Sequence, residues 1–208
     1  MSIMSEQSVR RILEAALTLF ARHGFKRSSM ADIAREAGVA RATLYLRFAD
    51  KSAVFEALAG ALVDDALSGA AAAWREAEDL ESNLAAMILA KDLRFFRLLR
   101  TTPHGAELLD LDADLAAKEA RRLDDGFSAL LVRQAEAAEE AGADVAALGG
   151  PEEFAAFLAV TAAGLKYETR TEAAYLAAVR RLARAAAAAV RSSKPQPAAR
   201  GPAQGDAL

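Results

Sequence analysis

Apolar residues recur at helical spacing along almost the whole chain, and the alternating pattern of a half-buried strand is nearly absent. In the first such stretch the apolar positions form one helical stripe: Val9, Ile12, Leu13, Ala16, Leu19 and Phe20. Gly24 follows and is well placed to end this helix, because glycine readily adopts the left-handed conformation of helix C-termini. The pattern therefore predicts an all-α protein that begins with an amphipathic helix.

Two short helices around a glycine turn are predicted within residues 29–51. Ser29 is a favourable N-cap for the first helix, and Asp32 places negative charge in its first turn. Gly38 permits a sharp turn with positive φ, and the second helix extends from about Ala40 to Phe48. This is the layout of a helix-turn-helix, whose second helix enters the DNA major groove.

The outer face of that second helix carries the candidate DNA contacts, because Leu44 and Phe48 are expected to face inward. Arg41, near the helix N-terminus, is the candidate for a bidentate contact to guanine, and Thr43 can reach a phosphate or a base. The candidate phosphate contacts are the side chains of Tyr45, Arg47 and Lys51 and the backbone N–H groups of Ser29 and Met30.

Behind the helix-turn-helix the sequence predicts a long helix and then a helical bundle. Breaks at Pro103 and at the Gly149-Gly150-Pro151 run divide the bundle into further amphipathic stretches. The expected domains are a DNA-binding domain at residues 1–51, a helical domain at 52–191 and a flexible tail rich in Pro, Gly and Ala at 192–208.

The protein is acidic overall, but its N-terminal segment is basic. The chain has a formal net charge of −3, yet residues 1–51 hold nine basic and five acidic side chains. A basic head on an acidic body is typical of a small DNA-binding domain joined to a second domain. There is no cysteine, which excludes disulfides and fits a cytoplasmic protein, and no apolar run approaches the ~20 residues of a membrane span.

Enzyme chemistry finds little support in the sequence. It contains no HExxH, no P-loop, no glycine-rich turn after a strand and no cysteine nucleophile. The two histidines, His23 and His104, are far apart along the chain. We therefore expect no catalytic residues, no cofactor and no metal site.

The string GFKRSSMADIAREAGVARATLYLRFADK resembles the DNA-binding region of tetracycline-repressor-like (TetR/AcrR) transcription regulators. The resemblance covers about Val9 to Leu58. It implies a homodimer, formed by the last two long helices, that binds a palindromic double-stranded operator. It also implies a helical C-terminal domain that binds a small-molecule effector, and DNA-contact roles for Arg41, Thr43, Tyr45 and Lys51.

The chain departs from the family's common pattern at four positions of the reading helix. Ala40 stands where a capping residue is usual, which weakens the cap of that helix. Ala42 replaces a common Gly, and its methyl favours a thymine contact. Leu46 and Arg47 stand where His and Tyr are frequent, so a polar contact is in doubt at the first and a phosphate contact is preserved at the second.

The sequence of the second domain, residues 52–191, contains fewer indications of function. Candidates for lining a largely apolar effector site are Phe95, Phe96, Leu99, His104, Phe127, Phe157 and Tyr167. The spacing of the aromatic residues is also that of an ordinary helical core. The family resemblance implies a ligand-released repressor. Two alternatives remain: a constitutive or partner-controlled DNA-binding regulator, and a helical protein-interaction module with an incidental basic head.

Overall fold

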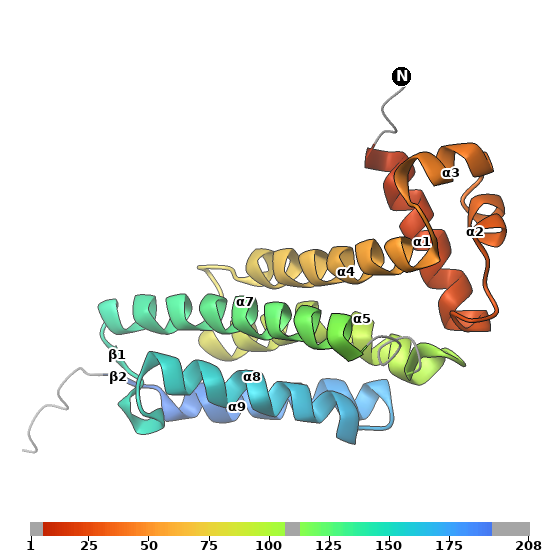
Figure 1. The fold of residues 1–208 in the computed structure, drawn as a ribbon. Coiled ribbons are helices and arrows are strands. Elements are labelled where there is room, and N and C mark those ends of the chain that lie inside the picture. Colours follow the sequence, from red (N-terminus) through yellow and green to blue (C-terminus); the bar gives the residue numbers. More distant parts are fainter. Residues whose placement is uncertain (1–5, 107–112, 193–208) are drawn as a thin grey trace, which may run out of the picture.

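The computed structural model describes residues 6–106 and 113–192, and its regular structure is helical apart from one short β pairing (Figure 1). The elements in chain order are α1 (Glu6–His23), α2 (Met30–Glu36), α3 (Arg41–Arg47), α4 (Lys51–Ala73), α5 (Leu80–Thr101), α7 (Ala113–Glu140), β1 (Ala143–Asp144), the 3-10 helix η1 (Ala146–Leu148), α8 (Pro151–Glu168), α9 (Glu172–Ala189) and β2 (Arg191–Ser192). The predicted all-α class is confirmed. None of the described helices combines the length and apolar character needed to cross a bilayer.

Helices α1, α2 and α3 form a head at one end of the long helix α4 (Figure 1). Gly24 ends α1 at φ 82°, and its N–H donates to the Phe20 carbonyl over 2.9 Å. Ser29 caps α2 by accepting from the Asp32 N–H, while the Asp32 carboxylate accepts from the Ser29 backbone. Gly38 makes the turn to α3 at φ 64°. The predicted helix stop, cap and glycine turn are therefore all present.

Three phenylalanines fix the head to the start of α4. The rings of Phe20, Phe25 and Phe55 meet edge to face, with centroids 5.2 to 6.4 Å apart. Asp50 caps α4 by accepting from the Ala53 N–H. The core of the head continues along α4 as far as Ala66, so α4 is shared between the two parts of the molecule.

The body consists of α4, α5, α7, α8 and α9, which lie roughly alongside one another (Figure 1). Its buried core brings together large side chains of four of these helices: Leu84, Met87, Ile88, Phe96, Phe127, Leu131, Phe154, Leu158, Tyr175 and Val179. Gly150 precedes Pro151 at the start of α8, as the sequence predicts.

The pairing of β1 with β2 was not predicted. Ala143 pairs with Ser192 and Asp144 with Arg191, in antiparallel orientation. Two residues per strand are too few to produce an alternating pattern, so the sequence carries no signal for them. The predicted tail begins at Ser192, and its residues 193–208 lie outside the described part of the chain.

The turn after α5 joins the body to the head. The His104 backbone N–H donates to the Ala21 carbonyl over 3.0 Å, and the Arg27 guanidinium lies 2.7 Å from His104 Nε2. A Cβ on Gly24 would lie 3.3 Å from the His104 ring, so the absence of a side chain at Gly24 allows this close approach. The end of α5 is thereby held against the end of α1.

Candidate nucleic-acid interface and the second domain

One face of helix α3 is exposed to solvent, and the opposite face packs into the core of the head. Leu44 is fully buried and Phe48 is 5% exposed, so they hold the helix against the head. The residues that point outward are Arg41, Ala42, Tyr45, Leu46 and Arg47, with Thr43 half-buried beside them. Within the described part of the chain, Arg41 and Tyr45 have no side-chain hydrogen-bond or ion-pair partner. Both side chains are thus available for an external partner.

The exposed face of α3 also contains an unusually open apolar residue. Leu46 is 84% exposed, and Ala42 lies one helical turn before it. This pair forms a short apolar stripe beside Arg41 and Tyr45, which are also one turn apart. The stripe is suited to the methyl group of thymine, whereas Arg41 is suited to guanine.

The N-terminus of α3 has no side-chain cap. Ala40 occupies the N-cap position with extended backbone angles, φ −65° and ψ 144°, and makes no side-chain hydrogen bond. The weak helix cap that the sequence predicts at Ala40 is therefore confirmed. The first N–H groups of α3 lack the side-chain acceptor that Ser29 supplies to α2.

Part of the hydrogen-bonding capacity at the N-terminus of α2 is already used by contacts within the protein. The Asp32 carboxylate accepts from the Ser29 N–H and hydroxyl and from Arg35 over 2.6 Å. These hydrogen bonds, led by that of the Ser29 hydroxyl, hold the pKa of Asp32 below its ordinary value. Because the Ser29 N–H is occupied by Asp32, Met30 is the remaining backbone candidate for a phosphate at this site.

The Lys51 side chain contacts the loop between α1 and α2. Its ammonium donates to the carbonyls of Phe25 and Ser28 over 2.6 and 2.8 Å, and it stands 4.3 Å from the centre of the Phe25 ring. Partial burial lowers its pKa. Lys51 thus ties the loop between α1 and α2 to the start of α4.

The structure does not gather the effector candidates into one site. Phe96 and Phe127 are 1% and 0% exposed in the core of the body, and Leu99 is half-buried. Phe157 and Tyr167 are 42% and 59% exposed on α8, whereas His104 lies at the junction with the head. Phe95 alone among these candidates lines the cleft that is described next.

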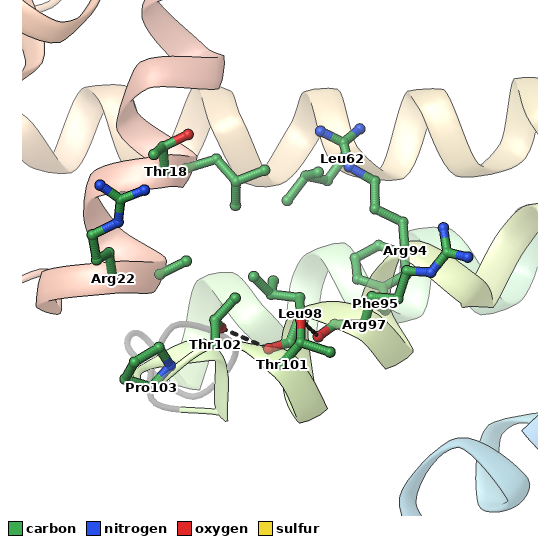
Figure 2. Close-up of a pocket in the computed structure, with 12 residues that line it drawn as sticks. Thr18, Arg22, Leu62, Arg94, Phe95, Arg97, Leu98, Thr101, Thr102 and Pro103 are labelled. Carbon is green, nitrogen blue, oxygen red and sulfur yellow. Dashed lines mark hydrogen bonds between the residues drawn. The ribbon is translucent and has the colours of Figure 1, made fainter. Parts of the chain in front are cut away.

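A cleft of about 450 Å³ separates the head from α5 (Figure 2). Its walls are Leu17, Thr18, Ala21 and Arg22 of α1, Leu62 of α4, and Arg94, Phe95, Arg97, Leu98, Thr101, Thr102 and Pro103 of α5 and the following turn. Arg94 pairs with Asp65 over 3.0 Å, and Arg97 forms a bidentate pair with Glu172 over 2.6 and 2.9 Å. An occupant of this cleft would touch both parts of the molecule.

Sequence reasoning missed a set of charged residues inside the body. Lys91 and Asp92 of α5 and Lys166 of α8 are 2%, 0% and 8% exposed. A signal was present, because Lys91 stands in the apolar stripe that runs from Leu84 to Phe95. A charged residue at a buried position of an amphipathic pattern requires a partner or a function.

The comparisons with known proteins agree with this geometry. Residues 12–58 match the family model of bacterial regulatory proteins, tetR family. A comparison with curated proteins finds no match. Among solved structures, the chain is similar to the SmeT–triclosan complex, with 18% identity, a TM-score of 0.66 and coverage of 91% of this chain and 94% of that one.

Two further solved structures have the same fold. One is E. coli NemR in its reduced form, with 16% identity, a TM-score of 0.66 and coverage of 90% of this chain and 100% of that one. The other is the fatty acid degradation regulator FadR from Bacillus halodurans, with 20% identity, a TM-score of 0.59 and coverage of 88% and 96%. The family match falls on the helix-turn-helix and the start of α4, and members of that family are regulators rather than enzymes. Residues 12–58 therefore form a DNA-binding helix-turn-helix region of the tetR type, and the chain has the fold of a TetR-like transcriptional regulator.

Proposed function

We propose that this protein is a homodimeric repressor that binds a near-palindromic operator and is released from it by a small molecule. The observation that carries the proposal is the open face of α3, where Arg41 and Tyr45 have no partner among the described residues. Arg41, Ala42 and Thr43 select bases, and Tyr45 and Arg47 contact phosphates. Met30 supplies a backbone N–H to phosphate.

A dimer is supported by the outer face of α8. Phe157, Val160, Gly164 and Tyr167 are all exposed and follow one another at intervals of three and four residues. Val160 is 74% exposed, and exposed apolar residues that line up along one helix face are typical of an interaction surface. A symmetric pairing through α8 and α9 would cover this stripe and present two heads to successive half-sites, about 34–36 Å apart.

Release by a small molecule is supported by two contacts between the body and the head. Helix α4 belongs to the cores of both, and the turn after α5 is hydrogen-bonded to α1 through His104 and Ala21. A ligand that moves α5 or α4 would change the spacing of the two heads, and the difference in its affinity for the two arrangements would set the coupling. SmeT, which shares the fold, has been solved with triclosan.

One observation favours the alternative of a regulator without a small ligand. Phe96 and Phe127 fill the core of the body, and Phe96 stacks on Tyr175 with ring centroids 4.6 Å apart. A ligand bound among these rings would have to displace them. A regulator whose heads are set by a partner protein or by dimerisation alone would keep this core closed.

The test is selection of operator DNA with the purified full-length chain, followed by fluorescence anisotropy. Arg41→Ala combined with Tyr45→Phe should weaken specific binding by about 100-fold or more, because a bidentate base contact contributes ~1–3 kcal/mol and a phosphate contact adds to it. Circular dichroism and the dimer mass should stay unchanged. The exposed Arg133→Ala on α7 serves as the matched control.

Salt dependence gives an independent check. Several phosphate contacts per head predict that affinity falls steeply between about 50 and 200 mM salt, because condensed counterions are released on binding. A flat salt response together with wild-type affinity of the double variant would favour the protein-interaction module. A screen of small molecules against the operator complex then decides between release by ligand and constitutive binding.

A further inference from the structure

The charged residues buried in the body form one cluster at the meeting point of its helices. Lys91 Nζ lies 2.8 Å from Asp92 Oδ2, and Lys166 Nζ donates to Asp92 Oδ1 over 3.1 Å. The two ammonium groups stand over aromatic rings, Lys91 at 4.6 Å from Phe127 and Lys166 at 5.4 Å from Phe95. At their formal charges, two lysines and one aspartate leave an excess of one positive charge inside the core.

An excess charge in this position is costly. An ionised group in a low-dielectric interior is stabilised only when it is paired and hydrogen-bonded, and the aromatic faces offset only part of the loss of water. Two ammonium groups carry six N–H donors. Among the described residues, Asp92 is the one carboxylate that meets them, and its Oδ2 lies against Lys91 without hydrogen-bond geometry.

Tyr175 of α9 adds a second group without a partner. It is fully buried and stacked on Phe96, and its hydroxyl has no hydrogen-bond partner within the described part of the chain. Burial and the nearby Asp92 carboxylate raise its pKa above the ordinary value of a tyrosine. The hydroxyl therefore keeps its proton and is a buried donor that lacks an acceptor.

We propose that this cluster is the polar end of the effector site and that the effector is an organic anion, an apolar molecule with one carboxylate or a comparable singly charged group. The proposal rests on the ligand-released function given above. A single negative charge would neutralise the cluster, and its oxygens would accept from Lys91, Lys166 and the Tyr175 hydroxyl. Entry of the molecule would displace the Phe127 ring from Lys91, and the rings of Phe95 and Phe127 would then contact the carbon skeleton.

The position of the cluster connects it with the head. Phe95 lies over Lys166 on one side and lines the cleft against α1 on the other. Further along α5, Arg100 donates to the Tyr167 carbonyl of α8, and the turn after α5 holds Ala21 through His104. An anion that draws Lys91 and Lys166 together would shift α5 against α8. The shift would reach α1 through Phe95 and the turn.

The first test compares a carboxylate with its neutral amide on the full-length chain, using phenylacetate with phenylacetamide and decanoate with decanamide. At least one carboxylate should raise the unfolding temperature and bind about tenfold or more tightly than its amide in calorimetry, as expected for hydrogen bonds to a charged group. If no carboxylate is preferred over its amide, the proposal is wrong.

The second test uses variants and needs no ligand. Lys91→Met leaves the neutral, hydrogen-bonded pair of Lys166 and Asp92, so its unfolding temperature should equal or exceed that of the wild type. A purely structural cluster predicts the opposite, a clear loss of stability in Lys91→Met, and that result would overturn the proposal. Lys118→Met, at an exposed lysine of α7, is the matched control and should leave the unfolding temperature unchanged.

Two further variants, Lys166→Met and Tyr175→Phe, report on binding. Lys166→Met should abolish the preference for the carboxylate, and Tyr175→Phe should weaken carboxylate binding about three- to tenfold while keeping the ring stack. Operator binding is measured separately by anisotropy. Carboxylate binding without DNA binding would refute the proposed function alone, whereas release from DNA by neutral molecules only would refute the anionic effector alone.

Discussion

At the scale of single residues, Lys51 has a structural role in the head in addition to its candidate DNA contact. Its ammonium is held by the carbonyls of Phe25 and Ser28 and by the face of the Phe25 ring. These contacts fix the loop from which α2 begins. The family resemblance gives Lys51 a DNA-contact role, and the geometry adds a structural one.

The first prediction concerns this lysine. Lys51→Met should lower the free energy of unfolding by about 1.5–3 kcal/mol, because two carbonyls lose a charged donor in a half-buried position. Urea unfolding followed by circular dichroism measures this loss. Lys26→Met, at an exposed lysine of the same loop, is the control and should stay within about 0.5 kcal/mol of the wild type. Equal stability of the two variants would leave Lys51 with the phosphate role alone.

Residue types and spacing predict some single-residue roles and miss others. Ser29, Gly38 and Leu44 were predictable because a cap, a positive φ and a buried anchor each follow from local sequence. The carbonyls around Lys51 come from a loop more than twenty residues away, and the partner of Asp92 comes from α8. Contacts of this kind depend on tertiary packing, which a periodic pattern does not specify.

At the scale of elements, the two short helices of the head differ in how they begin. Helix α2 has a complete capping box formed by Ser29 and Asp32, whereas Ala40 gives α3 no side-chain acceptor. The stabilisation from ionised Asp32 is present above the ordinary pKa of a carboxyl and is lost as the pH falls through its lowered value. Helix α3 has no comparable contribution at its start.

The second prediction repairs the missing cap. Ala40 already has the extended backbone of an N-cap, so Ala40→Ser should stabilise the protein by about 0.5–2 kcal/mol by accepting from the first free N–H groups of α3. Ala49→Ser, an exposed position just after α3, is the control and should have little effect. Urea unfolding of both variants measures the difference. An unchanged midpoint in Ala40→Ser would mean that its hydroxyl does not reach these groups.

The boundaries of most elements follow from sequence, with one exception. Gly24, Asp50 and Pro151 mark helix ends and starts because their backbone or side-chain chemistry acts locally. The pairing of β1 with β2 joins Asp144 to Arg191 across nearly fifty residues, and neither strand is long enough to show a period. Its existence is a consequence of where α7 and α9 end.

At the scale of the whole molecule, the outer face of α8 is the feature that a single chain leaves unexplained. The stripe of Phe157, Val160, Gly164 and Tyr167 is exposed, and Gly164 has open space around it. The neighbouring α9 contributes exposed alanines at Ala173 and Ala177, which permit a close approach of another helix. In the proposed dimer, a second copy of the chain related by a two-fold axis would cover this surface with the same stripe.

The third prediction tests this assembly and what depends on it. Val160→Asp should convert the protein from twice the 22.0 kDa chain mass to the chain mass in sedimentation or light scattering, because a carboxylate near the symmetry axis meets its own copy in a desolvated interface. Binding to a full operator should then fall to the level of a single half-site, since two linked heads bind far more tightly than one. The head itself should keep its structure and its weak affinity for a half-site.

Ala137→Asp, at an exposed position of α7, adds the same charge away from the stripe and should leave both mass and affinity unchanged. A Val160→Asp protein that remains at twice the chain mass would place the dimer interface on another face, and the spacing of the two heads would then have to be derived from that face instead.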